Sequence, residues 1–376
     1  MSRVIYADNA ATTKLDLDAF NAMRPFLLED YSNASQPYSF AKASKKALKN
    51  ARESIAKCIN AEPNEIFFTS GGTESDNWAL KGIMNLHKPN SVIITSEFEH
   101  HAVLNSCKYL ESCGYKAKYI RPTKEGFITP KSLKSEISEN AVLSSVMMAN
   151  NEIGTIQPIK ELCAVAHENG LIFHTDAVQA LGHIRVDVKD LNIDMLSCSA
   201  HKFNGPKGIG FLYIKNGVEI QPCINGGAQE GGMRGGTENI SAVVGMAKAL
   251  EKNIAAIAEN TEHLQKLEQT IVHLLSSAKI DYIRNGAQPQ ISGNLSLSFK
   301  GAEGEMLLHR LDLMGIMVST GSACDSQNTQ ISHVLKAIAA PNEYAKGTIR
   351  ISLGKDNTTD EAVKIAKALI HILKGK

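Results

Sequence analysis

The 376-residue chain has no block of like charge, few aromatic residues, few cysteines and no long apolar run. Each of these features excludes a class of protein. Its 40 basic and 39 acidic residues nearly balance, and no block of five or six like charges occurs. A chain without a basic stretch lacks the electrostatic footprint expected for nucleic acid or an anionic membrane surface. Aromatic residues make up only 6% of the chain, but no long polar or repetitive tract accompanies this, which excludes a disordered or collagen-like protein. An enzyme acting on small molecules is the class that remains.

Cysteines are few and long apolar runs are absent. The seven cysteines are an odd number and form neither a Cys-x-x-Cys motif nor a Cys/His pattern with zinc spacing, so we expect neither a disulfide framework nor a metal site. No apolar run approaches the ~18 residues needed to cross a bilayer, and the first residues do not resemble a secretion signal. The sequence therefore predicts a protein of the reducing cytoplasm without a membrane span.

Between about residues 45 and 220, helix-like stretches alternate with short apolar runs rich in β-branched residues. This alternation is typical of βαβ units, in which helices cover a mostly parallel sheet. The predicted strands are 66–69, 92–95, 143–148, 171–175, 195–199 and 210–214. Polar clusters follow the first five strands, at 70–73, 97–101, 150–152, 176–179 and 199–202. Because ligands bind beyond the carboxyl ends of the strands in open parallel sheets, these clusters predict one shared site.

The rest of the chain predicts a smaller α+β domain. Apolar residues recur at steps of three and four from Val244 to Leu274, which predicts one long amphipathic helix, straight or kinked, that links the two domains. Beyond it we expect a strand at 294–299, a helix at about 303–314, a loop at 319–326, a strand at 349–353 and a closing helix from Asp360. The expected fold class is therefore α/β with an added α+β domain.

Asp176 and Lys202 each follow a predicted strand and are separated by one helix-sized segment. A lysine that forms a Schiff base and a carboxylate that pairs with a pyridinium nitrogen are the two groups that a pyridoxal phosphate site needs. Gly72 and Thr73, at the start of a predicted helix, would offer backbone N–H groups and a hydroxyl to the phosphate. His100 could stack on the ring, and Gln179 could donate to its phenolate oxygen.

These residues also allow other interpretations. Lys207 competes with Lys202, although a lysine in a Gly-Pro-Lys-Gly turn is more often solvated. His100 and His101 beside two glutamates suggest a metal, but adjacent histidines point in different directions and no third ligand has suitable spacing. The Gly-rich segment 226–236 lacks the Gly-Lys-Ser/Thr of a phosphate-binding loop. We therefore predict no metal.

Cys324 differs from the other six cysteines. It lies among small polar residues in a predicted loop, whereas the others mostly fall in helical or strand patterns where a buried, inert thiol is expected. A thiol in an exposed loop near a coenzyme site is a candidate nucleophile.

Taken together, these motifs resemble the cysteine desulfurases of the NifS/IscS-like type, within the class V aminotransferases. The resemblance runs nearly from end to end and rests on residues 6–13, 69–77, 150–154, 174–179, 199–202, 205–210, 233–239, 321–324 and 349–354. It implies the pyridoxal phosphate fold type I. We place the large coenzyme-binding domain at residues 14–257 and form the small domain, which carries the catalytic cysteine loop, from residues 1–13 and 258–376.

The resemblance also implies a role for each matching residue. Lys202 would bind the coenzyme covalently, Asp176 would face the pyridine nitrogen, Gln179 the phenolate oxygen, and His100 would stack on the ring and act in catalysis. The phosphate would be held by Gly72, Thr73, Ser199 and His201, and by Thr237 of the other subunit, which implies a homodimer. Asn151 and Arg350 would receive the carboxylate of L-cysteine. Cys324 would form the persulfide and pass it to a sulfur-acceptor protein.

Three departures from the family pattern concern other surfaces of the molecule. Tyr38 stands where the family often has histidine, Gly231 where it usually has arginine, and Asp325 where it usually has threonine or serine. The acceptor remains open among Fe-S assembly, tRNA thiolation and DNA sulfur modification. Two alternative functions also remain: another class V enzyme, such as a transaminase or a β-lyase, or a coenzyme-binding scaffold for a sulfur-transfer partner.

Overall fold

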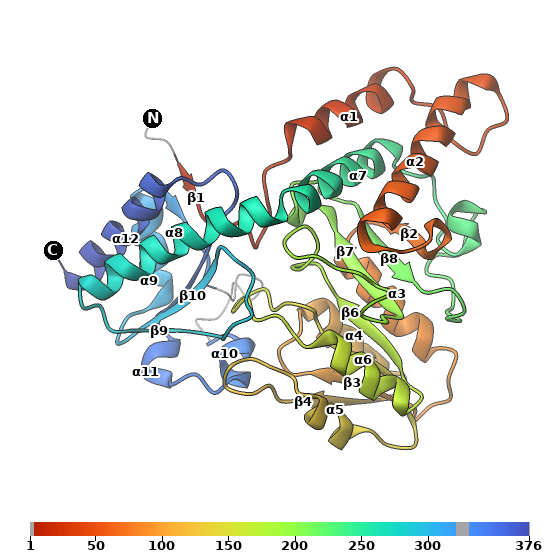
Figure 1. Ribbon diagram of the computed structural model, residues 1–376. Helices are drawn as coiled ribbons and strands as arrows, with labels where there is room; N and C mark the ends of the chain where they lie inside the picture. The colour runs from red at the N-terminus through yellow and green to blue at the C-terminus, as the bar shows by residue number, and fades with distance from the viewer. Residues whose placement is uncertain (1–3, 321–330, 376) are drawn as a thin grey trace.

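The computed structural model describes residues 4–320 and 331–375. Within them the chain forms a seven-stranded sheet of order β2-β8-β7-β6-β5-β3-β4, with helices on both faces (Figure 1). Its strands are β2 (Ile66–Thr69), β3 (Val92–Ser96), β4 (Lys116–Ile120), β5 (Ala141–Ser145), β6 (Ile172–Asp176), β7 (Met195–Ser199) and β8 (Gly210–Ile214). Only β8 runs against its neighbours in this sheet, so the expected mostly parallel sheet is confirmed.

Burial on both faces explains the apolar strand sequences. Ile93 and Leu143 pack under α3 (Gly72–Met84) and α4 (His101–Ser112), whereas Ile94 and Phe173 belong to the core on the other face. A parallel strand covered on both sides needs apolar residues at successive positions rather than at alternate ones. The second face is covered by helices that include α2 (Lys42–Ile59), α6 (Ile159–Glu168) and α7 (Ile240–Ala255).

A smaller antiparallel sheet, β12-β10-β9, forms beside the large one. Its strands are β9 (Tyr282–Arg284), β10 (Asn294–Phe299) and β12 (Thr348–Ser352), and β1 (Ile5–Tyr6) pairs separately with β11 (Ile316–Met317). Residues from β1, β10 and β12 share one apolar core with α8 (Ile257–Ser277), α9 (Gly304–Leu313) and α12 (Thr359–Lys374). The remaining helices are α1 (Leu17–Leu28), α5 (Pro130–Glu136), α10 (His333–Ala337) and α11 (Asn342–Ala345).

The linking helix predicted from the sequence is present and is broken once. α7 and α8 follow one another across Ala256, and together they run from the large sheet to the small one (Figure 1). The separate cores favour two domains, while the boundaries at residues 14 and 257 stay a prediction.

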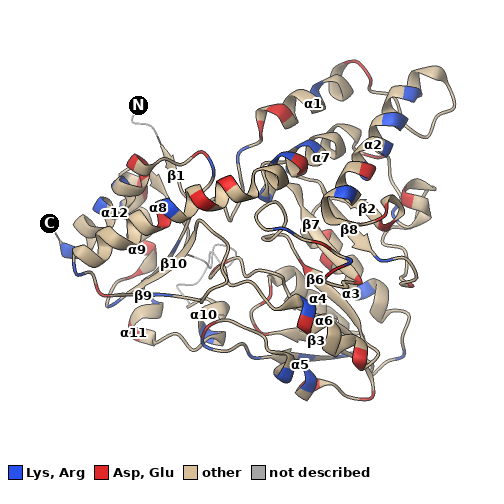
Figure 2. Ribbon diagram, viewed as in Figure 1, with Lys and Arg blue, Asp and Glu red and all other residues tan. Residues whose placement is uncertain are grey.

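Charge is distributed without a dominant sign. Figure 2 shows Lys and Arg interspersed with Asp and Glu over the helices and loops of this view, as the near-neutral balance of the chain predicts. Among the helices of the described residues, none combines the length and the apolar character that crossing a membrane requires.

Candidate active site

The strand ends of the large sheet enclose a cavity of about 660 Å³. β6 ends at Asp176 and the adjacent parallel strand β7 ends at Ser199, with Lys202 in the 3-10 turn that follows. The cavity wall contains these predicted site residues: Gly72, Thr73, His100, Asn151, Asp176, Gln179, Ser199, His201, Lys202 and Arg350. The structure therefore brings together residues from five strand ends and from β12, which are far apart in the sequence.

Lys202 lines this cavity, and its amine is held by hydrogen bonds to the backbone. Its Nζ donates to the carbonyl oxygens of Ala10 and Ala11, at 2.6 and 2.9 Å. The amide of Gln179 donates to the same Ala10 oxygen, at 2.9 Å. The rival Lys207 is exposed on its turn, although it also borders the cavity. The amine best placed to hold a coenzyme is therefore that of Lys202.

Asp176 is a buried carboxyl at the base of the cavity. Burial raises its pKa, and the nearby His100 and Lys202 partly offset that increase. On the same strand face, His174 lies between the hydroxyls of Ser145 and Ser197, each 2.9 Å from a ring nitrogen. Burial lowers the pKa of His174 to about 3, so this ring is neutral at pH 7. A cationic ring nitrogen placed beside Asp176 would compensate its charge.

Close to Asp176 lies a second buried carboxyl that the sequence did not single out. Asp76, in α3, also borders the cavity, and burial together with the charge of Asp176 raises its pKa well above the usual range. Its Oδ1 has no hydrogen-bond partner among the described residues. Two adjacent buried carboxyls do not both ionise readily, because the charge of each disfavours the charge of the other.

The start of α3, which also borders the cavity, suits an anion. Gly72 begins α3, and a Cβ at this position would lie 2.6 Å from Cγ2 of Val178, so only glycine lets the helix end approach the strand ends. Free N–H groups at the start of such a helix bind phosphate. Thr73, Ser199 and His201 supply further side chains to the cavity, and burial lowers the pKa of His201 to about 4.

His100 caps α4, and its hydrogen bond determines which ring nitrogen carries the proton. Its Nδ1 accepts from the backbone N–H of Ala102 at 3.1 Å, so the neutral ring carries its proton on Nε2. Burial lowers the pKa of His100, which favours the neutral form. In this state His100 donates through Nε2; to accept a proton, its Nδ1 must give up the bond to Ala102.

Arg350 enters the cavity from β12. It is 5% exposed, its Nη1 donates to the carbonyl of Asn151 at 3.0 Å, and its Nη2 donates to Oδ1 of Asp8 at 2.8 Å. The Nε atom is buried and has no partner among the described residues. A buried guanidinium N–H without a partner is a ready donor for a carboxylate.

Two predicted residues lie elsewhere. Thr237 is exposed and does not border the cavity, so within one chain it does not reach the predicted phosphate position. Cys324 lies outside the described residues. Glu152, from the predicted polar cluster 150–152, and Ser332, for which the sequence predicted no role, border the cavity. The Ser332 hydroxyl donates a 2.6 Å hydrogen bond to Glu152.

The loop before Thr237 is held at two points. Glu230 accepts from both terminal nitrogens of Arg52, at 2.8 and 2.7 Å, and from the backbone N–H of Phe68. Arg234 donates to both oxygens of Glu74 beside the phosphate end of the cavity. Gly231, one of the departures from the family pattern, has a φ of +66°, a conformation that glycine adopts more easily than arginine.

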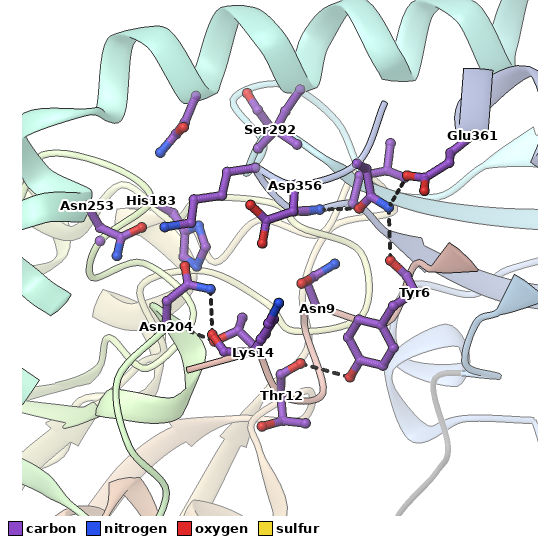
Figure 3. A pocket seen from close by; sticks show the side chains of 18 of the residues that line it. Tyr6, Asn9, Thr12, Lys14, His183, Asn204, Asn253, Ser292, Asp356 and Glu361 are labelled. Carbon is purple, nitrogen blue, oxygen red and sulfur yellow. Dashed lines mark hydrogen bonds between the residues drawn. The ribbon is translucent and has the colours of Figure 1, made fainter. Parts of the chain in front are cut away.

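A second cavity, of about 740 Å³, lies between the N-terminal segment, the α7–α8 junction and the 353–357 loop (Figure 3). It shares Thr12 and Lys207 with the first cavity, but none of the residues predicted to bind coenzyme or substrate borders it. Figure 3 shows a hydrogen bond from Tyr6 to the Thr12 carbonyl and one from Asn204 to the Lys14 carbonyl. Residues that line this second cavity therefore fix the N-terminal segment that joins the two sheets.

The donor set of the first cavity fits pyridoxal phosphate. An amine, a buried carboxyl and a helix N-terminus that begins at glycine all border this cavity, and these are the groups that can bind the aldehyde, ring nitrogen and phosphate of the coenzyme. Within the described residues, no group of three His, Cys, Asp or Glu side chains could hold a metal ion.

Comparison with known proteins gives one consistent result. The profile of the family Aminotransferase class-V matches residues 5–365. A cysteine desulfurase IscS of Clostridium botulinum is 46% identical over 100% of this chain and 96% of its own length. Among solved structures, a NifS-like protein has a TM-score of 0.94 at 37% identity, with both chains covered in full. A structure titled SspA in complex with cysteine has a TM-score of 0.84 at 35% identity and covers 94% of this chain and 100% of its own. The chain is a cysteine desulfurase of the pyridoxal phosphate-dependent class V aminotransferase family.

Proposed function

We propose that the chain takes the sulfur of L-cysteine onto Cys324 as a persulfide, releases L-alanine and passes the sulfur to an acceptor protein. Six of the seven cysteines lie in the described residues, and none of those six borders the cavity. Burial raises the pKa of Cys58 and Cys223 to about 11 and that of Cys107 to about 12, which makes these thiols poor nucleophiles. These observations support Cys324 as the thiol of the proposed site.

The residues flanking Cys324 support this assignment. Ser319 and Arg350 exchange two backbone hydrogen bonds, and Arg350 borders the cavity. Ile331, Ser332 and His333 border it as well, and His333 donates to the carbonyl of Glu99. Ser319 and the 331–333 segment thus lie beside the proposed site.

The cavity residues have separable roles in the proposed reaction. When bound, the coenzyme supplies an electron sink that weakens bonds at the substrate's Cα and Cβ. Lys202 holds the coenzyme and moves the α-proton, Asp176 keeps the ring nitrogen protonated, and Arg350 with Asn151 receives the substrate carboxylate. Cys324 as thiolate forms an S–S bond to the substrate sulfur while the Cβ–S bond breaks, and a proton delivered to carbon completes L-alanine.

The proposal includes a homodimer and an acceptor protein. Thr237 is exposed at the end of a loop that two ion pairs hold in place, which suits a hydroxyl donated to the phosphate site of a second copy. A cytoplasmic location, predicted from the sequence, fits a transfer that depends on a free thiol.

The test compares Cys324→Ala and Cys324→Ser with Cys113→Ala, which removes an exposed cysteine that does not border the cavity. Both Cys324 variants should bind coenzyme normally and release almost no alanine or sulfide from L-cysteine, because a serine hydroxyl is far less ionised than a thiol. Cys113→Ala should behave as the wild type. Mass spectrometry of the wild type after incubation with L-cysteine should find the added sulfur on the peptide that contains Cys324.

Two results would contradict the proposal. Full release of alanine by Cys324→Ala would favour a β-lyase that needs no thiol. A wild-type protein that cannot be loaded with pyridoxal phosphate would contradict every role assigned above.

A further inference from the structure

Arg350 is held by Asp8, a residue for which the sequence predicts no role. The carboxylate of Asp8 accepts from Nη2 at 2.8 Å, and the side chain of Arg350 is 6% exposed against 20% for Asp8. Asp8 does not border the cavity, so it does not reach the substrate position itself. Its effect on a ligand must pass through Arg350.

The chain around Asp8 is fixed against β12 by several hydrogen bonds. The N–H of Asn9 and its side-chain amide both donate to the Ser352 carbonyl, each at 3.0 Å, and the N–H of Ala10 donates to the Ser352 hydroxyl. The hydroxyl of Tyr6 donates to the carbonyls of Asp8 and Thr12, the second of which is drawn in Figure 3. Asp8 is therefore a rigid acceptor rather than a mobile surface carboxylate.

The hydrogen bonds that Arg350 already makes determine which of its N–H groups can bind a ligand. A guanidinium has five N–H groups, of which one is used by Asp8 and one by the Asn151 carbonyl. With one bond on each terminal nitrogen, the plane of the group is fixed from two sides. The N–H of Nε, buried and without a described partner, remains for a ligand.

We propose that Asp8 is a positioning residue that aligns Arg350 so that its Nε edge binds the carboxylate of the amino-acid substrate. This inference rests on the proposed function, because it takes Arg350 as the carboxylate-binding group. Without the Asp8 oxygen, Nη2 loses its fixed partner and the guanidinium plane is free to turn. The hydrogen bonds from Arg350 to the substrate carboxylate then lose their alignment. The amine of the substrate, which binds at the coenzyme, does not depend on this alignment.

The experiment measures binding to coenzyme-loaded protein by the change in visible absorbance, with two ligands that are not turned over as sulfur donors. L-Alanine carries both the amine and the carboxylate, whereas ethylamine carries the amine alone. In Asp8→Ala we expect the dissociation constant of L-alanine to rise about tenfold, with that of ethylamine unchanged within about twofold. Asp8→Asn keeps an acceptor oxygen for Nη2 and should fall between Asp8→Ala and the wild type.

The controls separate positioning from folding. Asp18→Asn disrupts the 2.7 Å ion pair with Lys252 in the same part of the chain and should change neither constant. An equal weakening of both ligands in Asp8→Asn, the isosteric variant, would show a general structural role and overturn the proposal, as would unchanged L-alanine binding in Asp8→Ala. Turnover of L-cysteine is not needed for this comparison. A wild type that releases no alanine from L-cysteine would therefore contradict the proposed function and leave the role of Asp8 measurable.

Discussion

Burial of single side chains decides which groups of the cavity carry charge. His174 and His201, with pKa values lowered to about 3 and about 4, are neutral near pH 7, and Asp76 and Asp176 both have raised pKa values. Near these neutral histidines and weakly ionising carboxyls, the cavity is bordered by Lys202, Lys207 and Arg350. This arrangement favours a cationic ring nitrogen over Asp176 and an anion at the start of α3.

Lys202 provides the first prediction at this scale. Lys202→Ala should abolish covalent attachment of pyridoxal phosphate and the visible absorbance that depends on it, because the Lys202 amine, which donates to the carbonyls of Ala10 and Ala11, is the group that would bond to the coenzyme. Reduction with borohydride followed by peptide mass spectrometry measures the attachment. Lys207→Ala is the matched control and should keep the attachment; the reverse pattern would transfer the role to Lys207.

Glu152 provides a second prediction, about pH. Burial raises its pKa to about 7, while the Ser332 hydroxyl and Arg350 act in the opposite direction. The unfolded chain releases this proton near pH 4.5 and the folded protein only near pH 7. Between these values the folded state binds more protons, so stability falls as pH rises. The total loss from this group is on the order of 3 kcal/mol.

Glu152→Gln should remove that loss, since the amide oxygen can still accept from Ser332. Urea unfolding at pH 4.5, 6, 7.5 and 8.5 measures the effect. The variant should gain stability relative to the wild type as pH rises through this range, and the difference should level off above about pH 8. A difference that does not change with pH would show that Glu152 ionises normally in the folded protein.

At the scale of elements, the loop that carries Thr237 depends on α2. The 3-10 turn Gln229–Gly232 places Glu230 at a φ of +49°, where its side chain meets Arg52 and the backbone N–H of Phe68. The Glu230 side chain is 3% exposed, and the Arg52 guanidinium also lies 4.3 Å from the Phe68 ring centroid. The buried Arg52–Glu230 ion pair therefore connects α2, the edge strand β2 and the loop that carries Thr237.

Arg52→Ala should destabilise the protein by about 3 kcal/mol, because it leaves the Glu230 carboxylate buried without its cation. Chemical denaturation measures the change. The control is Lys49→Ala on the same helix, whose pair with Glu53 is exposed, with the two side chains 74% and 48% accessible. Loss of such a pair should change stability by less than about 1 kcal/mol. Equal effects of the two substitutions would show that the Glu230 contact adds no stability.

The sequence predicted the apolar strands better than the strand that carries lysines, for a physical reason. β2, β7, β8 and β10 have the bounds predicted for them, because buried strands are largely apolar runs. β3, β5 and β6 were also predicted, but their bounds differ from the predicted ones, with β5 at Ala141–Ser145 instead of 143–148. The edge strand β4 was missed, since Lys116 and Lys118 interrupt any apolar pattern. The two-residue strands β1 and β11 are too short for a periodic signal.

The contacts within the cavity could also be predicted only in part from the sequence. Side chains with distinctive chemistry, such as Lys202 and Asp176, could be predicted from their positions after strands. The carbonyls of Ala10 and Ala11, which accept from Lys202, carry no signal in the sequence because every residue has a carbonyl. The bond between Asp8 and Arg350 joins positions 342 residues apart, and only the fold determines that they meet.

At the scale of the whole molecule, one chain supplies all but two of the predicted site residues to its cavity. Cys324 lies outside the described residues, and Thr237 is exposed away from the cavity. A two-fold dimer would bring Thr237 of each subunit to the phosphate end of the other's site, because contacts across such an axis are reciprocal. Each site would then depend on Lys202 from one chain and Thr237 from its partner.

Subunit mixing tests this arrangement. Lys202→Ala lacks the coenzyme amine, and Thr237→Asp would place a negative charge against the phosphate, so each variant alone should be nearly inactive. In a mixed dimer with exchange across the axis, both defects fall in one site and the other site is intact. Unfolding and refolding an equal mixture should therefore restore about one quarter of the wild-type desulfurase activity, since about half of the dimers are mixed and each has one working site. If Thr237 acted within its own chain, every site of the mixed dimer would carry one defect, and no activity would return. Sedimentation of the wild type as an active monomer would contradict the dimer itself.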